Sequence, residues 1–340
     1  MKPRIGLALS GGGSKGAFTV GVLQVIDQLL DPMPYPVISG TSTGSLVGTL
    51  LATGQFARLV EIYSTVQTKN IINPRYAFVG DLFGAAGTLV ATALLGGRAL
   101  YDQSALAATI AANVDFQRIL TLAERTRLIY STVDLQSGKL VTFNNRDHSA
   151  RQLADGLLAS TSIPVLMNPV SIRSAGKTSA YIDGGVREFL PLRAVFDSGI
   201  ELDHIIAIST APLEPKHKPS AFNKLLQIFG RTIDLLNSEV ARNDYFGALH
   251  YNALLRLVEN AEANGLSRAQ ILRGIPQPIR RRLTGKRSIP VTFIGPNRHL
   301  EMNALEFDPA TMRQVMNDGV KVAKRIVPKI VAELASNQET

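Results

Sequence analysis

The chain has 340 residues, of which 45% are hydrophobic and 19% are charged, a globular composition that excludes a disordered chain. It has no cysteine, which excludes disulfides, thiolate metal sites and a cysteine nucleophile. The formal net charge of +9 favours anionic partners, either lipid headgroups or nucleic acid.

No cleavable signal peptide is expected, because only a short apolar run follows Lys2 and Arg4 before the first glycines. The longest uncharged apolar stretch, residues 82–97, would span about 24 Å as a helix, less than the roughly 30 Å core of a bilayer. We expect a buried helix there, with an apolar flap over a site or a membrane-touching segment as alternatives. The expected location is cytoplasmic or peripheral to a membrane, and signal-independent secretion stays open.

The chain begins with a predicted strand, a glycine run and a helix. Residues 4–10 are rich in leucine and isoleucine, and residues 11–16 read GGGSKG. One face of the following helix carries Phe18, Val22, Val25, Ile26 and Leu29. Such a turn directs free N–H groups and the positive end of the helix dipole at one point, so it predicts an anion-binding loop.

A second strand, residues 36–39, leads into GTSTG at residues 40–44 and then into predicted helices over 44–52 and 57–65. The pattern G-x-S-x-G therefore occurs twice, around Ser14 and around Ser42. It marks a nucleophile elbow, in which the glycines let strand and helix pass closely while the serine is strained and exposed. Ser42 has the conventional flanks, whereas Ser14 lies in a run better suited to offering N–H donors.

The next segments continue the alternation of strands and helices. Residues 127–133 and 139–143 predict a hairpin, 151–159 a helix and 178–182 a strand that ends in Asp183-Gly184-Gly185. Pro191 opens a short helix, and residues 204–209 read as a buried strand. The alternation up to about residue 210 predicts an α/β layered architecture.

After residue 211 the sequence changes to a proline-rich connection and then to mainly helical segments. The cluster between residues 279 and 287 is typical of a solvated face, and it is also the best candidate for contact with phosphate headgroups; it contains Arg280, Arg281, Arg282, Lys286 and Arg287. Residues 289–294 predict a late strand able to rejoin the sheet. Asp308 and Pro309 predict the start of a closing helix, whose one face carries Met312, Val315, Met316, Gly319, Ala323 and Val327.

Two further patterns offer other chemistries. Gly11–Gly16 also fits the dinucleotide pattern G-x-G-x-x-G, but the next strand ends in Ser39-Gly40-Thr41, without the carboxylate that would hold a ribose. A serine nucleophile needs a base, and the chain order Ser42, Asp183, His would fit a hydrolase triad with His204, His217, His250 or His299. Against a triad, a single strand–helix unit precedes the elbow. Asp183 itself reads either as a catalytic carboxylate or as an ordinary turn residue.

Three blocks resemble the signature blocks of the patatin-like phospholipases. They are GGGSKGAF at residues 11–18, GTSTG at 40–44 and DGG at 183–185, and residues 159–164 resemble the family's small-residue and proline stretch. FDPATMRQVMNDG, at 307–319, resembles a common closing helix. The resemblance covers residues 4–210 and leaves 212–300 unplaced. Arg187 and Glu188 depart from it, because many relatives carry smaller or amide residues there.

The resemblance implies a three-layer α/β/α fold with a mostly parallel central sheet in a catalytic domain over residues 4–211. A mainly helical C-terminal extension, residues 212–335, would pack on this domain or continue it. The resemblance also implies that Ser42 is the nucleophile and Asp183 its only protein base, with the N–H groups of Gly11, Gly12 and Gly13 as the oxyanion hole. This chemistry requires no metal and no other cofactor.

We therefore expect a lipid acyl hydrolase of the phospholipase A or lysophospholipase type that forms an acyl-enzyme. The expected partners are a phospholipid or another acyl lipid and, transiently, an anionic membrane surface, but no nucleic acid. Contacts to anionic groups are expected from Lys15, Arg280, Arg281 and Arg282. A non-catalytic lipid-binding relative, a nucleotide-binding protein and a triad esterase stay as alternatives, and the oligomeric state stays open.

Overall fold

The computed structural model describes residues 2–30, 35–74, 97–174, 176–214 and 225–336. The predicted apolar stretch at residues 82–97 lies outside them except for Gly97, as does most of the proline-rich connection. In the described part, no helix combines the length and apolar character that crossing a membrane demands.

An eight-stranded sheet forms the centre of the molecule, in the order β10-β9-β1-β2-β5-β8-β7, with β6 paired to β5. Its strands are β1 (Ile5–Leu9), β2 (Val37–Thr41), β5 (Arg127–Asp134), β6 (Leu140–Asn144), β7 (Val170–Ser174), β8 (Lys177–Asp183), β9 (His204–Ile208) and β10 (Val291–Ile294). Strands β10, β9, β1, β2 and β5 are parallel, whereas β6, β7 and β8 pair antiparallel. A separate short ribbon consists of β3 (Asn73–Pro74) and β4 (Tyr101–Asp102).

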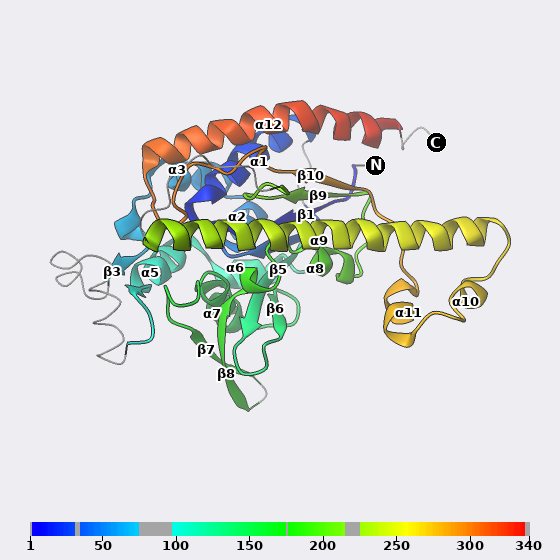
Figure 1. Ribbon diagram of the computed structural model, residues 1–340, viewed down its shortest axis with the longest axis horizontal. Helices are drawn as coiled ribbons and strands as arrows, with labels where there is room; N and C mark the ends of the chain where they lie inside the picture. Colours follow the sequence, from blue (N-terminus) through cyan, green and yellow to red (C-terminus); the bar gives the residue numbers. More distant parts are fainter. Residues whose placement is uncertain (1, 31–34, 75–96, 175, 215–224, 337–340) are drawn as a thin grey trace.

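Helices cover both faces of this sheet (Figure 1). The described helices are α1 (Gly16–Leu30), α2 (Thr43–Ala52), α3 (Phe56–Thr65), α5 (Ser104–Asn113), α6 (Phe116–Thr121), α7 (Ala150–Ser160), α8 (Leu192–Asp197), α9 (Leu225–Ala263), α10 (Arg268–Ile271), α11 (Gln277–Leu283) and α12 (Pro309–Ser336), with 3-10 turns η1 (Gly13–Lys15), η2 (Thr68–Asn70) and η3 (Gly184–Val186). One side packs against α1, α2 and α12, and the other against α8 and α9. The predicted three-layer, mostly parallel fold is confirmed.

The alternation of side chains along β1 explains the two layers. Ile5, Leu7 and Leu9 belong to the core shared with α1 and α12, whereas Ala8 belongs to the core shared with α8 and α9. Of the predicted apolar face of α1, all members are buried except Leu29, which is 48% exposed near the end of the helix. Asp27 and Gln28 are exposed as well, so the last turn of α1 lies at the surface.

The closing helix α12 packs directly on α1 (Figure 1). A Cβ atom on Gly21 would collide with the Met316 carbonyl oxygen, and one on Gly319 would collide with the Phe18 carbonyl oxygen. Glycines at both positions therefore allow the two backbones to touch. Asp308 caps α12 as predicted, because its carboxylate accepts the Thr311 N–H at 2.8 Å.

The late strand does rejoin the sheet, since β10 pairs parallel with β9. Residues beyond 212 thus contribute both an edge strand and the helix α12 to the layered core. The division into a domain at 4–211 and an extension at 212–335 stays a prediction.

Candidate active site

The second G-x-S-x-G block forms a strained turn between β2 and α2. Ser42 has φ 54° and ψ −127°, a backbone conformation that L residues rarely adopt and that concentrates at functional sites. A Cβ atom on Gly44 would collide with the Leu9 carbonyl oxygen, and one on Gly40 would lie 2.5 Å from the backbone of Gly44. Both glycines are therefore required for the strand and the helix to pass so closely.

Hydrogen bonds among several serines hold this turn in position. The Ser42 N–H donates to the Ser160 hydroxyl at 3.1 Å, and that hydroxyl donates to the Ser131 carbonyl at 2.8 Å. Ser45 and Ser160 also share a hydrogen bond of 2.9 Å between their hydroxyls. Ser160 comes from the end of α7, so the small-residue stretch at residues 159–164 holds the Ser42 backbone in place.

Asp183 reaches the same point from 141 positions further along the chain. It ends β8, which pairs antiparallel with β5 so that Asp183 lies opposite Thr132, while Thr41 lies opposite the neighbouring Ser131. One strand therefore separates the ends of β2 and β8, and Asp183 stops level with Ser42.

The Asp183 carboxylate is buried, with 6% of the residue exposed. Its Oδ1 accepts the Gly185 N–H at 2.7 Å. Burial raises the pKa of this carboxyl to about 6, although hydrogen bonds from the Ser42 hydroxyl and the Gly185 N–H act in the opposite direction. A carboxylate with a raised pKa is a stronger base than an exposed aspartate.

The glycine run lies beside this pair. Gly12 and Gly13 have φ values of 141° and 58°, conformations that favour glycine. The Gly11 N–H donates to the Phe189 carbonyl at 3.2 Å, whereas no acceptor among the described residues takes the N–H of Gly12 or of Gly13. Of the three predicted donors, these two are therefore the ones open to a ligand.

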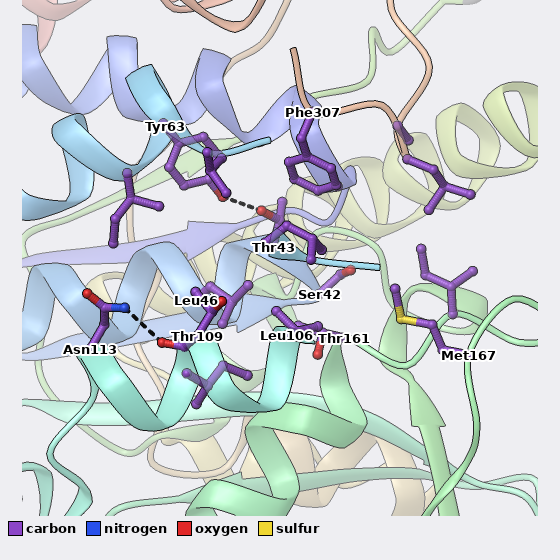
Figure 2. Close-up of a pocket in the computed structure, with 18 of the residues that line it drawn as sticks. Ser42, Thr43, Leu46, Tyr63, Leu106, Thr109, Asn113, Thr161, Met167 and Phe307 are labelled. Atoms are coloured by element: carbon purple, nitrogen blue, oxygen red, sulfur yellow. Dashed lines mark hydrogen bonds between the residues drawn. The ribbon is translucent and has the colours of Figure 1, made fainter. Parts of the chain in front are cut away.

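A cavity lined mainly by apolar side chains opens beside Ser42 and Gly13 (Figure 2). We refer to it as the apolar cavity. It encloses about 830 Å³ of empty space including its mouth. Side chains from α2, α3, α5 and several connecting segments line it, among them Leu46, Leu50, Ile62, Leu106, Ile110, Met167 and Phe307. Two hydrogen-bonded polar pairs lie in its wall, Thr43 with Tyr63 and Asn113 with Thr109.

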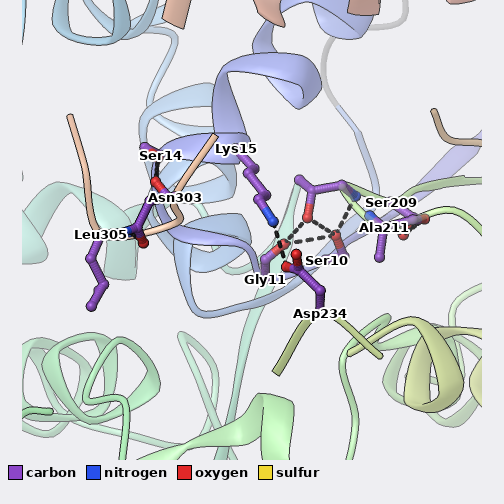
Figure 3. A network of polar contacts seen from close by, with 10 residues as sticks. Ser10, Gly11, Ser14, Lys15, Ser209, Ala211, Asp234, Asn303 and Leu305 are labelled. Carbon is purple, nitrogen blue, oxygen red and sulfur yellow. Dashed lines mark hydrogen bonds and ion pairs between the residues drawn. The ribbon is translucent and has the colours of Figure 1, made fainter. Parts of the chain in front are cut away.

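The Lys15 side chain reaches Asp234 on α9 (Figure 3). Its ammonium forms an ion pair of 2.6 Å with Asp234, and only 9% of its side chain is exposed. Lys15 therefore has a carboxylate partner within the chain. This pair fastens the glycine run to α9.

The predicted arginine cluster lies far from the serine turn. Arg280, Arg281 and Arg282 are exposed on α11, which Figure 1 places at the opposite end of the molecule from α5. Arg280 donates to the carbonyls of Arg273 and Ile275, and Arg282 lies 5.1 Å from the ring centre of Tyr251. The structure does not bring these arginines to the apolar cavity.

His204 is one of the histidines that a catalytic triad with Ser42 would require as the base. His204 begins β9 opposite Ile5, the first residue of β1, whereas Ser42 follows the far ends of the parallel strands. Its Nε2 pairs with the Thr292 hydroxyl at 2.8 Å. His204 is therefore at the wrong edge of the sheet to serve Ser42.

Sequence reasoning missed two residues that organise the site. Ser160 was read as one of several small residues, and Phe189 was not singled out at all. The Phe189 carbonyl holds Gly11, and its ring lies where a Cβ on Gly11 would contact it at 3.1 Å. Only the position of Phe189, six residues after Asp183, could have suggested a role.

Comparisons with known proteins show which proteins this chain resembles. A family model described as patatin-like phospholipase matches residues 7–196. A cGAMP-activated phospholipase from Escherichia coli strain TW11681 is 26% identical over 288 residues, covering 75% of this chain and 76% of the relative. A cUMP-AMP-activated phospholipase from Escherichia coli is 26% identical over 246 residues, covering 67% and 73%. Among solved structures, VipD from Legionella pneumophila aligns with a TM-score of 0.48 at 12% identity, covering 97% of this chain and 67% of VipD.

Proposed function

This chain belongs to the patatin-like phospholipase family, and on that premise we propose that it is a lipid acyl hydrolase with Ser42 as nucleophile and Asp183 as base. One observation carries the proposal. Ser42 combines a left-handed backbone, an interaction of its hydroxyl with the buried Asp183 carboxylate and a position in the wall of an apolar cavity. Membership of the family and the phospholipase relatives support lipid hydrolysis as the activity.

In the first half-reaction, the Ser42 Oγ attacks the carbonyl carbon of a fatty-acyl ester while the Asp183 carboxylate accepts the hydroxyl proton. The carbonyl oxygen becomes an oxyanion, which the N–H groups of Gly12 and Gly13 stabilise. Preorganised donors of this kind are each worth about 2.7–4 kcal/mol of barrier. The tetrahedral intermediate then expels the alcohol, which takes the proton from Asp183, and leaves the acyl group on Ser42.

In the second half-reaction, Asp183 accepts a proton from water as the water oxygen attacks the acyl-enzyme carbonyl. The intermediate collapses, Ser42 leaves with the proton from Asp183, and a fatty acid is released. The pKa of about 6 suits both halves, because Asp183 is mainly ionised at neutral pH yet more basic than an exposed aspartate.

The surroundings of Ser42 favour an acyl lipid as substrate. The apolar cavity begins at Ser42 and offers an acyl chain a lining of aliphatic and aromatic side chains. The net charge of +9 favours approach to an anionic membrane surface. We infer cleavage of the phospholipase A or lysophospholipase type at such a surface, with the protein bound peripherally.

The test is product analysis with vesicles of phosphatidylglycerol and of phosphatidylcholine. The proposal expects free fatty acid and lysophospholipid from the wild-type chain, faster release from phosphatidylglycerol, and neither product from Ser42→Ala. Diacylglycerol or phosphatidate as the main products would indicate attack at phosphorus and would contradict acyl hydrolysis. The absence of all products from both kinds of vesicle, also when cyclic dinucleotides are added, would contradict it equally.

A second proposal concerns control of this activity. The two Escherichia coli relatives are phospholipases activated by cGAMP and by cUMP-AMP, and we infer that hydrolysis by this chain also responds to a nucleotide. The measurement is fatty-acid release from vesicles with and without 3′,3′-cGAMP. A rate that neither this nor other cyclic dinucleotides alter would contradict the inference.

A further inference from the structure

A second cavity, hereafter the polar cavity, lies on the other side of the segment that carries Asp183. It shares no lining residue with the apolar cavity, and it encloses about 1230 Å³ of empty space including its mouth. The turn of the β5–β6 hairpin, the residues after η3, and helices α8, α9 and α11 surround it. Its walls therefore come from five separate parts of the chain.

Four cationic residues, hereafter the rim cations, line this cavity: Lys139, Arg187, Arg193 and Arg282. All four residues are exposed, so their charges cost little desolvation. Arg193 pairs with Asp197 at 3.3 Å. The charges of Lys139, Arg187 and Arg282 create a positive potential that an anion relieves. Arg187 already donates to the Gly138 carbonyl at 2.7 Å, which fixes its guanidinium beside the hairpin turn.

Two carboxyl groups line the same cavity below the rim. Glu188 is 4% exposed and accepts the Ser131 hydroxyl at 3.0 Å, and Asp244 on α9 accepts the N–H groups of Phe189 and Leu190 at 2.9 Å each. Burial raises the pKa of both carboxyls to about 7. Such groups accept hydrogen bonds from hydroxyl or amino donors and can also donate when protonated.

We propose that the polar cavity binds a small molecule that carries phosphate together with hydroxyl or amino groups. The rim cations would hold the phosphate, since arginine pairs with it bidentately. The carboxyls of Glu188 and Asp244 would accept hydrogen bonds from the hydroxyl or amino groups. Nucleotides and free lipid headgroups share this chemistry, and the experiment separates them.

Arg187 and Glu188 also connect the cavity to the serine turn. They follow η3 in the short segment between Asp183 and Phe189. Thr41, the residue before Ser42, donates through its hydroxyl to the Glu188 carbonyl at 3.0 Å. The Phe189 carbonyl accepts the Gly11 N–H. A ligand held by Arg187 and Glu188 therefore acts on both halves of the site, a coupling that rests on the proposed function.

The binding test is isothermal titration calorimetry on the full chain with AMP, cyclic di-AMP, glycerophosphoinositol and inorganic phosphate as probes. The proposal expects at least one organic phosphate to bind with a Kd of about 100 µM or tighter, and at least tenfold more tightly than inorganic phosphate. The tightest probe identifies the source as a nucleotide or a lipid headgroup. If no organic probe binds more tightly than inorganic phosphate, the proposal is overturned.

The variants Lys139→Glu and Arg187→Glu should each weaken that binding at least tenfold, while Lys329→Glu, an exposed lysine on α12, should leave it within twofold. Binding that survives both reversals at the rim would overturn the assignment. Circular dichroism checks folding, and Lys139→Glu decides the test if Arg187→Glu does not fold. Calorimetry needs no hydrolysis, so failure of the proposed function would leave this result readable.

The coupling between ligand binding in the polar cavity and hydrolysis at Ser42 requires a separate measurement. The probe that binds most tightly, at a saturating concentration, should change the rate of fatty-acid release by the wild-type chain at least threefold. The same concentration should leave the rate of Lys139→Glu unchanged. An unchanged wild-type rate at saturation would show that the cavity binds without acting on Ser42, and would contradict the coupling.

Discussion

The two G-x-S-x-G blocks share a spacing but differ in almost every structural respect. Ser42 has φ 54° and opens on the apolar cavity. Ser14 lies in the 3-10 turn η1, is completely buried, and donates through its hydroxyl to the Asn303 carbonyl at 3.0 Å. Ser42 therefore lines a cavity, whereas Ser14 forms a hydrogen bond that holds a loop in place.

The flanking glycines differ in the same way. A Cβ on Gly44 would meet the backbone of β1, which cannot move aside, whereas one on Gly16 would meet the side-chain oxygens of Thr43 at 2.7 Å and Tyr63 at 2.8 Å. In both places the glycines of the motif allow a neighbouring segment to approach the backbone closely. Whether its serine can react depends on the backbone angle and on a neighbouring carboxylate, which the motif does not contain.

The largest expected effect separates the two serines directly. Ser42→Ala should lower kcat for ester hydrolysis by about 10⁴-fold or more, because the nucleophile is lost. Ser14→Ala should leave kcat within about threefold and lower the free energy of unfolding by about 1 kcal/mol, the typical net value of one hydrogen bond. Initial rates and urea titrations measure both. Equal losses of activity in the two variants would remove the distinction.

The next prediction concerns two carboxylates, Asp183 beside Ser42 and Asp234, which pairs with Lys15. Asp183→Asn should lower kcat about 10³- to 10⁴-fold, since the amide cannot accept the Ser42 proton but can still accept the Gly185 N–H. Asp234→Asn, which removes the partner of Lys15, should instead lower the free energy of unfolding by about 1–3 kcal/mol. Activity at 25 °C and thermal melting distinguish the two outcomes. An active Asp183→Asn would rule out this residue as the base.

Glycine replacements sharpen the comparison through stability. Gly44→Ala should lower the free energy of unfolding by about 3 kcal/mol or more, because the Leu9 carbonyl oxygen blocks the new methyl group. Gly16→Ala should cost about 1–2 kcal/mol, because the side chains of Thr43 and Tyr63 can shift. Urea unfolding monitored by circular dichroism gives both values. The reverse order would mean that the serine turn is not the tighter of the two.

The smallest expected effect is the dependence on pH. Only the ionised form of Asp183 can accept the Ser42 proton, so kcat/KM should fall as pH drops through about 6, the pKa of this carboxyl. One unit below that value the rate should be about tenfold lower. The profile should be measured with a neutral ester, so that the substrate itself does not titrate. Activity constant down to pH 4.5 would contradict Asp183 as the base.

The sequence predicts well what depends on neighbours in the chain. The strands β1 and β2, the turn at Ser42, the hairpin β5–β6 and the capped start of α12 all follow from local residues. It could not show that β8 runs antiparallel to β5, because a strand's direction depends on partners far along the chain. Nor could it show that α12 continues through Pro328, where packing on α1 outweighs the local preference.

The site follows the same division. Ser42 and Asp183 were identified by pattern and resemblance, but the partners of Gly11 and Lys15 lie 178 and 219 positions away, at Phe189 and Asp234. The local sequence around a residue does not predict contacts with residues so far along the chain. The same reason explains why the arginines of α11 could be found as a cluster in the sequence yet not located relative to Ser42.

The most direct test of the account is to identify the residue that reacts with a fluorophosphonate probe. The wild-type chain should be labelled and digested, and the adduct located by peptide mass spectrometry. We expect one adduct, on Ser42, that is absent from Ser42→Ala and forms much more slowly in Asp183→Asn. An adduct on Ser14, or no adduct on a folded chain that hydrolyses lipid, would contradict it.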